Sequence, residues 1–134
     1  MNFFFDIFGL RRRQGPRVAA RWLVDVRVPG TQNFVGFFTC DISILGMRMI
    51  GETSESFKHV LSEDGRSHMR LRMPGYRRLL PVEAELKWGM GEIGNFQTGW
   101  RFTQINQEVE NLLNQYIETH PDDIIQDPRN VQPD

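Results

Sequence analysis

Residues 18–28 read VAARWLVDVRV, a stretch in which apolar and polar side chains alternate along the chain. Valine, alanine and tryptophan occupy one set of alternate positions, while Arg21, Asp25 and Arg27 fall on the opposite side. A period of two residues is typical of a β-strand with one buried face. Because Pro29-Gly30 then interrupts the pattern, we predict a half-buried strand that ends at a turn.

Similar stretches recur downstream and are separated by turn residues. Aromatic, β-branched or alternating segments predict further strands at residues 34–40, 46–50, 67–73, 82–88 and 99–103. Residues 57–62 are ambiguous, and a strand is the favoured interpretation there. Since no helix separates these short segments, they favour an antiparallel barrel of about six strands over a doubly wound sheet.

The periodicity changes after the last predicted strand. Apolar residues from Ile105 to Ile117 recur at helical spacing, so a helix is predicted over residues 106–119. Asn106 is a suitable N-cap, and Pro121 ends the helix. Residues 120–134 hold several charges and three prolines, which predicts a disordered tail. Residues 1–10 form an apolar, phenylalanine-rich arm, for which packing on the domain and docking to a partner protein are both open.

The composition suits one globular domain. The chain has 134 residues, of which 40% are hydrophobic and 25% are charged, with a net charge of −1. Cys40 is the only cysteine, which excludes an intrachain disulfide and a cysteine-based zinc site. The apolar arm precedes Arg11–Arg13, the reverse of the order in a signal peptide. We therefore expect a cytoplasmic protein for which membrane contact is only a minor option.

Two segments carry the binding chemistry. The first is Arg11-Arg-Arg-Gln-Gly-Pro-Arg17, before the first strand, and the second is Asp41-Ile-Ser-Ile-Leu-Gly46, between the next two. Arginine forks bind phosphate and the O6 and N7 atoms of guanine. A carboxylate can accept the N1 and N2 protons of guanine, and a serine hydroxyl both donates and accepts. Together the segments favour a guanine nucleotide, and Gly46 permits close approach of the ligand or a positive φ.

These motifs resemble those of the PilZ domain family, as Arg13-Gln-Gly-Pro-Arg17 followed by Asp41-Ile-Ser-Ile-Leu-Gly46. Gly99-Trp-Arg-Phe102 and the following helix are also similar, so the resemblance covers residues 11–119. It implies a six-stranded barrel with a C-terminal α-helix that binds cyclic dimeric GMP (c-di-GMP). The implied ligand residues are Arg12, Arg13, Arg17, Asp41, Ser43 and Gly46, and Arg12 implies an intercalated ligand dimer.

We expect a receptor that passes the c-di-GMP signal to a protein partner, and neither an enzyme nor a metalloprotein. No nucleophile with a base and no metal-ligand spacing stands out in the sequence. The alternative is an adaptor of the same fold that acts in motility or pilus assembly without a nucleotide. Binding of single-stranded nucleic acid is disfavoured, because alternation points most aromatic residues inward. Trp88 is accordingly assigned to the core, although stacking on guanine stays open.

Overall fold

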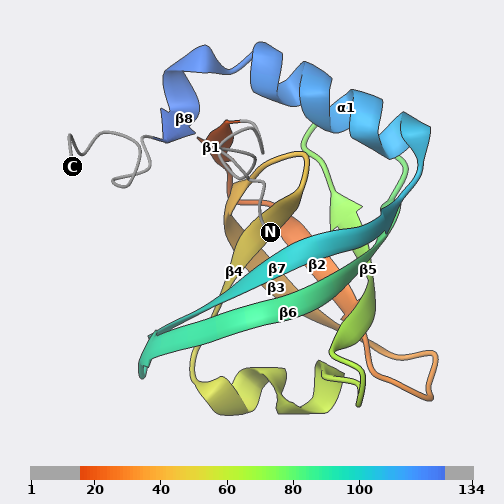
Figure 1. Ribbon diagram of the computed structural model, residues 1–134, viewed down its shortest axis with the longest axis vertical. Coiled ribbons are helices and arrows are strands. Elements are labelled where there is room, and N and C mark those ends of the chain that lie inside the picture. The colour runs from red at the N-terminus through yellow and green to blue at the C-terminus, as the bar shows by residue number, and fades with distance from the viewer. Residues whose placement is uncertain (1–15, 126–134) are drawn as a thin grey trace, which may run out of the picture.

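The computed structural model describes residues 16–125 and contains eight strands, one α-helix and two 3₁₀-helices (Figure 1). The strands are β1 (Arg17–Ala19), β2 (Leu23–Arg27), β3 (Phe34–Ile42), β4 (Gly46–Gly51), β5 (Arg66–Arg72), β6 (Leu80–Glu92), β7 (Asn95–Ile105) and β8 (Ile124–Ile125). The helices are η2 (Ser54–Val60), α1 (Gln107–Glu118) and η3 (Pro121–Asp123).

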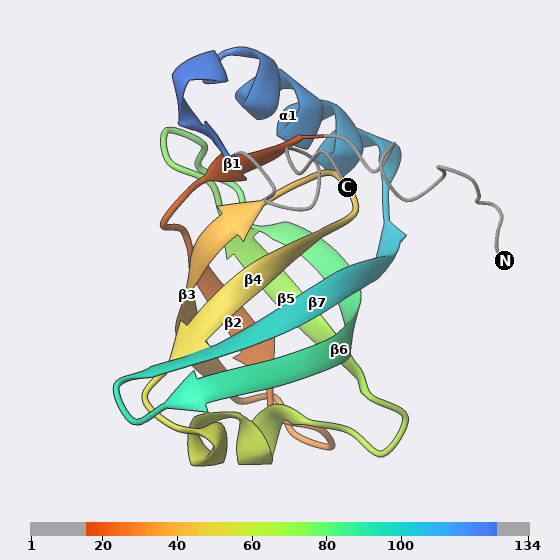
Figure 2. The same ribbon diagram turned by 60° about the vertical axis from the view of Figure 1, so that its left-hand side comes forward.

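Six of the strands close into a barrel. The strand order is β2-β5-β6-β7-β4-β3-β1-β8, and an additional pairing between β2 and β3 closes the ring. Closure is possible because β3 is long enough to pair with β2 over its first half and with β4 and β1 over its second. All pairings are antiparallel, so the predicted barrel is confirmed, with β1 and β8 added beside it (Figure 2).

Helix α1 lies across one end of the barrel (Figures 1 and 2). It buries Val109, Leu113 and Ile117, and its Tyr116 ring meets Trp22 edge-on at a centroid distance of 4.9 Å. Asn106 caps the helix by accepting a hydrogen bond from the Val109 amide at 2.8 Å. The predicted helix and its N-cap are therefore confirmed, with bounds one residue shorter at each end.

The strand predicted at residues 57–62 is wrong. This segment lies largely in the 3₁₀-helix η2, at the end of the barrel opposite α1 (Figure 1). Thr53 and Ser56 form a capping box, which satisfies backbone amides at the start of the helix. Phe57 and Val60 are buried and fill that end of the barrel, so the segment acts as a plug without joining the sheet.

The stretch 18–28 forms two strands, β1 and β2, where one was predicted. Between them, the Ala20 amide donates to the Cys40 carbonyl at 3.1 Å, and the Thr39 hydroxyl donates to the Ala20 carbonyl at 2.5 Å. The Trp22 amide donates to the same hydroxyl oxygen at 2.9 Å. Between β1 and β2 the chain thus stays beside β3. There the Ala20 carbonyl and the Trp22 amide bond to the Thr39 side chain.

The predicted tail also begins too early. Residues 121–125 form η3 and β8, and β8 pairs with β1 through Arg17↔Ile125 and Val18↔Ile124. The physical reason is that β1 has an edge not covered by β3, and two isoleucines provide a β-prone partner for it. The rest of the tail, residues 126–134, and the arm at residues 1–10 lie outside the described residues. None of the helices within residues 16–125 has the length and hydropathy needed to traverse a bilayer.

Candidate functional site

The centre of the candidate site is the buried carboxylate of Asp41 on β3, whose side chain is 0% exposed. One oxygen, Oδ1, accepts a hydrogen bond from Arg17 Nη1 on β1 at 2.9 Å. The other, Oδ2, accepts from Arg48 Nε on β4 at 2.6 Å and also contacts Arg48 Nη2. A buried carboxylate needs such partners, since desolvation without them is very unfavourable. Both guanidinium groups remain partly open to solvent, so the site combines a buried carboxylate with hydrogen-bond donors that a ligand can reach.

Asp41 and Arg48 are paired next to a β-bulge in β3. The register of β3 and β4 shifts between Thr39 and Asp41, so Thr39 pairs with Met49 and Asp41 pairs with Arg48. Cys40 is the extra residue. Asp41 lies on the turn side of the bulge, so it keeps the register that the turn sets, in which Ile42 pairs with Met47 and Asp41 pairs with Arg48. The bulge shifts the register of the residues before Asp41.

The segment after Asp41 forms a tight connection between β3 and β4. The buried Ser43 hydroxyl donates to the Gly46 carbonyl at 3.3 Å and accepts from the Leu45 amide at 3.2 Å. At Gly46, an added Cβ would lie 2.2 Å from the Trp100 carbonyl oxygen on β7. Gly46 is not among the residues with positive φ. Its absent side chain therefore allows close approach of the β7 backbone.

A row of paired residues extends the site across the barrel. Ala19, Asp41, Arg48, Gly99 and Trp88 are successive partners on β1, β3, β4, β7 and β6. The Trp88 ring lies against Gly99, where an added Cβ would approach Trp88 Cε2 and Nε1 to 2.2 Å. Trp88 therefore lies two strands away from Arg48, and the residue between them, Gly99, has no side chain.

Trp88 is not a core residue, contrary to the prediction from strand alternation. Its side chain is 38% exposed. The register of β6 and β7 shifts between Leu86 and Trp88, so Lys87 is a bulged residue. After the bulge the side chains that the alternation assigns to the core face point outward. In the part of the chain before this bulge, Val82 and Ala84 face the core as predicted.

Cys40, the bulged residue, is half-buried beside the site. Burial raises the pKa of its thiol above the ordinary value, and the neighbouring Asp41 charge raises it further. Arg48 and Arg21 oppose this increase in the pKa. The thiol is consequently protonated at neutral pH, which makes it a poor nucleophile.

The structure thus brings Arg17 and Asp41 into direct contact, while Ser43 and Gly46 form the adjoining turn. Arg12 and Arg13 lie outside the described residues. Sequence reasoning missed Arg48, although a signal was present: it stands between Met47 and Met49 in a predicted strand, so it points away from the core. Its distance from the turn at Gly46 also places it close to Asp41 in an antiparallel hairpin.

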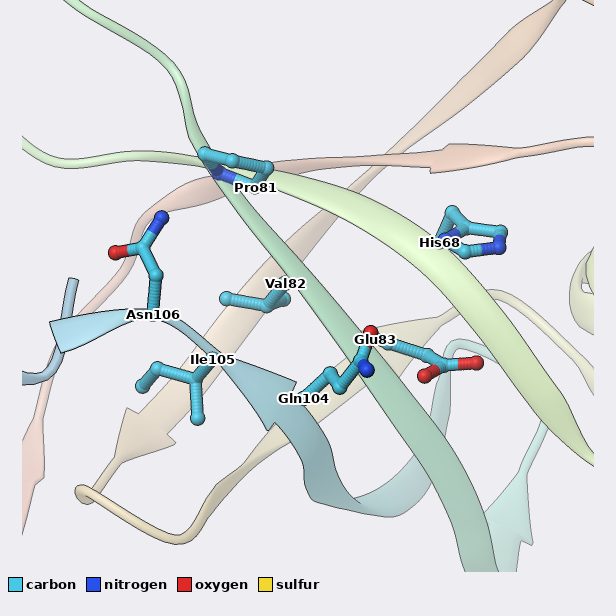
Figure 3. Close-up of a pocket in the computed structure, with 7 residues that line it drawn as sticks. All are labelled: His68, Pro81, Val82, Glu83, Gln104, Ile105 and Asn106. Carbon is cyan, nitrogen blue, oxygen red and sulfur yellow. The ribbon is translucent and has the colours of Figure 1, made fainter.

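A separate hollow of about 420 Å³ lies on the outside of β5, β6 and β7 (Figure 3). Its lining includes His68, Glu83, Gln104 and the apolar residues Val82 and Ile105, and none of the predicted ligand residues that lie within residues 16–125. Among residues 16–125, no group of three histidine, cysteine or acidic side chains is placed to hold a metal ion. The Asp41 site is therefore the place where the predicted chemistry converges.

Comparisons with known proteins agree with this fold. The chain is similar to Bacillus subtilis inhibitor of motility (MotI/DgrA), with a TM-score of 0.66 and 16% identity over 82% of this chain and 51% of that one. It is also similar to the PilZ domain with c-di-GMP of YcgR from Escherichia coli, with a TM-score of 0.59 and 20% identity over 77% of this chain and 86% of that one. For YcgR in complex with c-di-GMP, the TM-score is 0.60 and the identity 19%, over 79% of this chain and 44% of that one.

This chain therefore spans about half the length of the MotI/DgrA chain and less than half of the longer YcgR chain. A search of curated protein sequences finds no match. The model of the PilZ domain matches residues 11–119, which include both arginine and aspartate motifs and the C-terminal helix. With most of its length matched, and with the barrel and helix in place, the chain belongs to the PilZ domain family.

Proposed function

We propose that this protein is a c-di-GMP receptor whose binding site is centred on Asp41. The observation that carries the proposal is the buried Asp41 carboxylate with guanidinium groups from two neighbouring strands, Arg17 and Arg48. Arginine donors suit phosphate and the O6 and N7 edge of guanine, and a carboxylate suits the N1 and N2 edge. Membership of the PilZ family supports the choice of ligand.

The contacts of Asp41 suggest how the ligand enters. A carboxylate offers about four acceptor positions, and Asp41 uses both of its oxygens for arginine. We infer that guanine replaces Arg17 at Oδ1, and that the released guanidinium turns to phosphate or to the guanine O6 and N7 atoms. Arg48 stays at Oδ2 and keeps the carboxylate oriented.

The other motif residues complete the proposal. Arg12 and Arg13 supply further phosphate and guanine contacts, and Arg12 favours an intercalated ligand dimer. Ser43 and Gly46 act mainly by fixing the turn, because the Ser43 hydroxyl is already bonded within it. The exposed Trp88 ring provides a surface on which guanine can stack.

The test is calorimetric titration of the full chain with c-di-GMP. Arg17→Ala should weaken binding by about 1–3 kcal/mol, in line with the loss of a bidentate guanine contact. Arg66→Ala is the matched control, since Arg66 is exposed at the start of β5 and makes no ion pair within residues 16–125. Equal losses in both variants would mean nonspecific electrostatic attraction.

Asp41→Asn tests the assignment of the guanine edge. The amide keeps the size of the side chain but gives up the ionised acceptor, so affinity for c-di-GMP should fall relative to that for the adenine analogue. Absence of any nucleotide binding by the unmodified protein would favour the adaptor function instead. In either case we propose that the domain acts by binding a partner protein and catalyses no reaction.

A further inference from the structure

A second charged surface lies on the outside of strands β3, β2 and β5, which are neighbours in the sheet. We call it the arginine–aromatic face, and it consists of Arg21, Arg27, Arg70, Arg72, Phe34 and Phe38. Arg21 lies between β1 and β2, and the other side chains alternate with the core residues of their strands, as expected for the outer surface of a barrel. None of them belongs to the candidate nucleotide site.

The face carries more positive charge than its surroundings neutralise. The other basic residues of β5 lie opposite acidic residues of β6 in the strand register, Arg66 opposite Glu85 and His68 opposite Glu83. Glu83 and His68 also line the hollow in Figure 3, so the hollow lies where the acidic residues of β6 face β5. Arg70, in contrast, is opposite Pro81. The acidic edge of the barrel therefore stops where the arginine–aromatic face begins.

Among residues 16–125, Asp25 is the one acidic residue that forms ion pairs with this face. Its Oδ2 lies 2.8 Å from Arg72 Nη2 and 3.5 Å from Arg70 Nη2. Arg21 and Arg27 form no ion pair with any residue between 16 and 125. Arg70 and Arg72 thus share one largely buried carboxylate, and the two other arginines add positive charge that no ion pair within the described residues offsets.

Two of the guanidinium groups lie over aromatic rings. Arg70 Cζ lies 3.6 Å from the centroid of Phe34, and Arg21 Cζ lies 4.3 Å from that of Phe38. Gly36, which pairs with Asp25, stands between the two phenylalanines and has no side chain to obstruct them. A stacked guanidinium uses its face for the ring and keeps in-plane N–H groups for an acceptor. Holding the fork in place also reduces the entropy lost when it binds.

We propose that the arginine–aromatic face binds an acidic segment of a partner protein. Its carboxylates would meet the arginine forks, and the exposed part of Phe38 would supply apolar contact. Arginine and aromatic side chains are the residues that most often dominate binding energy at protein interfaces. Nucleic acid fits less well, because guanidinium groups already cover ring faces on which bases would stack.

The experiment uses the full chain and a fluorescein-labelled peptide of glutamate and leucine, with fluorescence anisotropy as the readout. Arg27→Glu should weaken binding at least roughly fivefold, and Arg21→Glu should do the same, whereas Arg66→Glu should change it little. All three side chains are on the outer surface, and thermal unfolding checks that each variant is folded. The Arg27 variant should retain c-di-GMP binding, which separates this surface from the nucleotide site.

Amide chemical shifts of the ¹⁵N-labelled protein locate the peptide. Shifts concentrated at residues 21–27, 34–38 and 70–72 would support the proposal. Shifts confined to residues 11–17, equal losses in the Arg27→Glu and Arg66→Glu variants, or no binding would overturn it. Equal or tighter binding of a single-stranded oligonucleotide with the same charge as the peptide would overturn it in favour of nucleic acid.

Discussion

Arg17, which donates to Asp41, pairs on its other side with Ile125 near the far end of the chain. Strand β1 therefore lies between β3, which holds the aspartate, and the two-residue strand β8. A three-residue strand has few hydrogen bonds of its own, so both neighbours help to hold it in place. The candidate nucleotide site thus depends on a contact between the two ends of the described chain.

Removal of residues 124–134 should increase amide hydrogen exchange in β1. The truncation deletes β8 and leaves one edge of β1 exposed to water, which favours local opening. Exchange measured by mass spectrometry or NMR at residues 17–19 gives the readout. The matched control removes residues 126–134 only and keeps β8, so its exchange should equal that of the full chain. If both truncations behave alike, the pairing with β8 does not stabilise β1.

The alternation of side chains was enough to predict the barrel strands, because most of them have one face in a common core. Val24, Val26, Met69 and Leu71 are buried at the positions that the period of two indicates. The motif spacing likewise predicted that Arg17 and Asp41 lie side by side in one binding site. Their separation in sequence is bridged by the pairing of β1 with β3, a nonlocal contact that the family resemblance implied.

The wrong prediction for Trp88 comes from a backbone irregularity. The bulge at Lys87 turns Trp88 outward. The bulged residue is neither a glycine nor a proline, so its position carries no strong local signal. The plug at η2 is different: its phenylalanine and valine fit either strand or helix, and the capping box decided for helix.

Arg48→Ala should lower the free energy of unfolding by about 1–3 kcal/mol, because it leaves the buried Asp41 oxygen with fewer donors. It should also weaken c-di-GMP binding, since the carboxylate loses the group that orients it. Arg101→Ala is the control, as Arg101 is exposed on β7 and forms no ion pair within the described residues. Urea denaturation measures the stability, and equal values for the two variants would contradict the anchoring role.

The single cysteine offers a sensitive probe of the Asp41 charge. Burial and Asp41 raise the pKa of Cys40 in the folded protein. The folded state therefore binds the proton more tightly, and its advantage is lost as the pH rises through the thiol range. Alkylation by iodoacetamide should be slower than in the urea-unfolded chain across mildly alkaline pH, and its midpoint should lie higher. In Asp41→Asn, the midpoint should move down, whereas an unchanged midpoint would mean that burial alone sets it.

Gly99→Ala should destabilise the protein and disturb Trp88. The new methyl group would lie 2.2 Å from Trp88 Cε2 and Nε1, so the indole must move off the strand. Overpacking of this kind is unfavourable by about 1–3 kcal/mol. Tryptophan fluorescence and urea denaturation give the two readouts.

Trp88→Ala removes the ring and supplies the second arm of a double-mutant cycle with Gly99→Ala. In the Trp88→Ala background, the added methyl group should have little effect on stability, because the atoms that it would meet are gone. A methyl group that destabilises both backgrounds equally would show that the strain lies in the β7 backbone. In the c-di-GMP titration, each single variant should bind less tightly than the unmodified protein, since displacement of the ring and its removal both take away the proposed stacking surface beside Arg48.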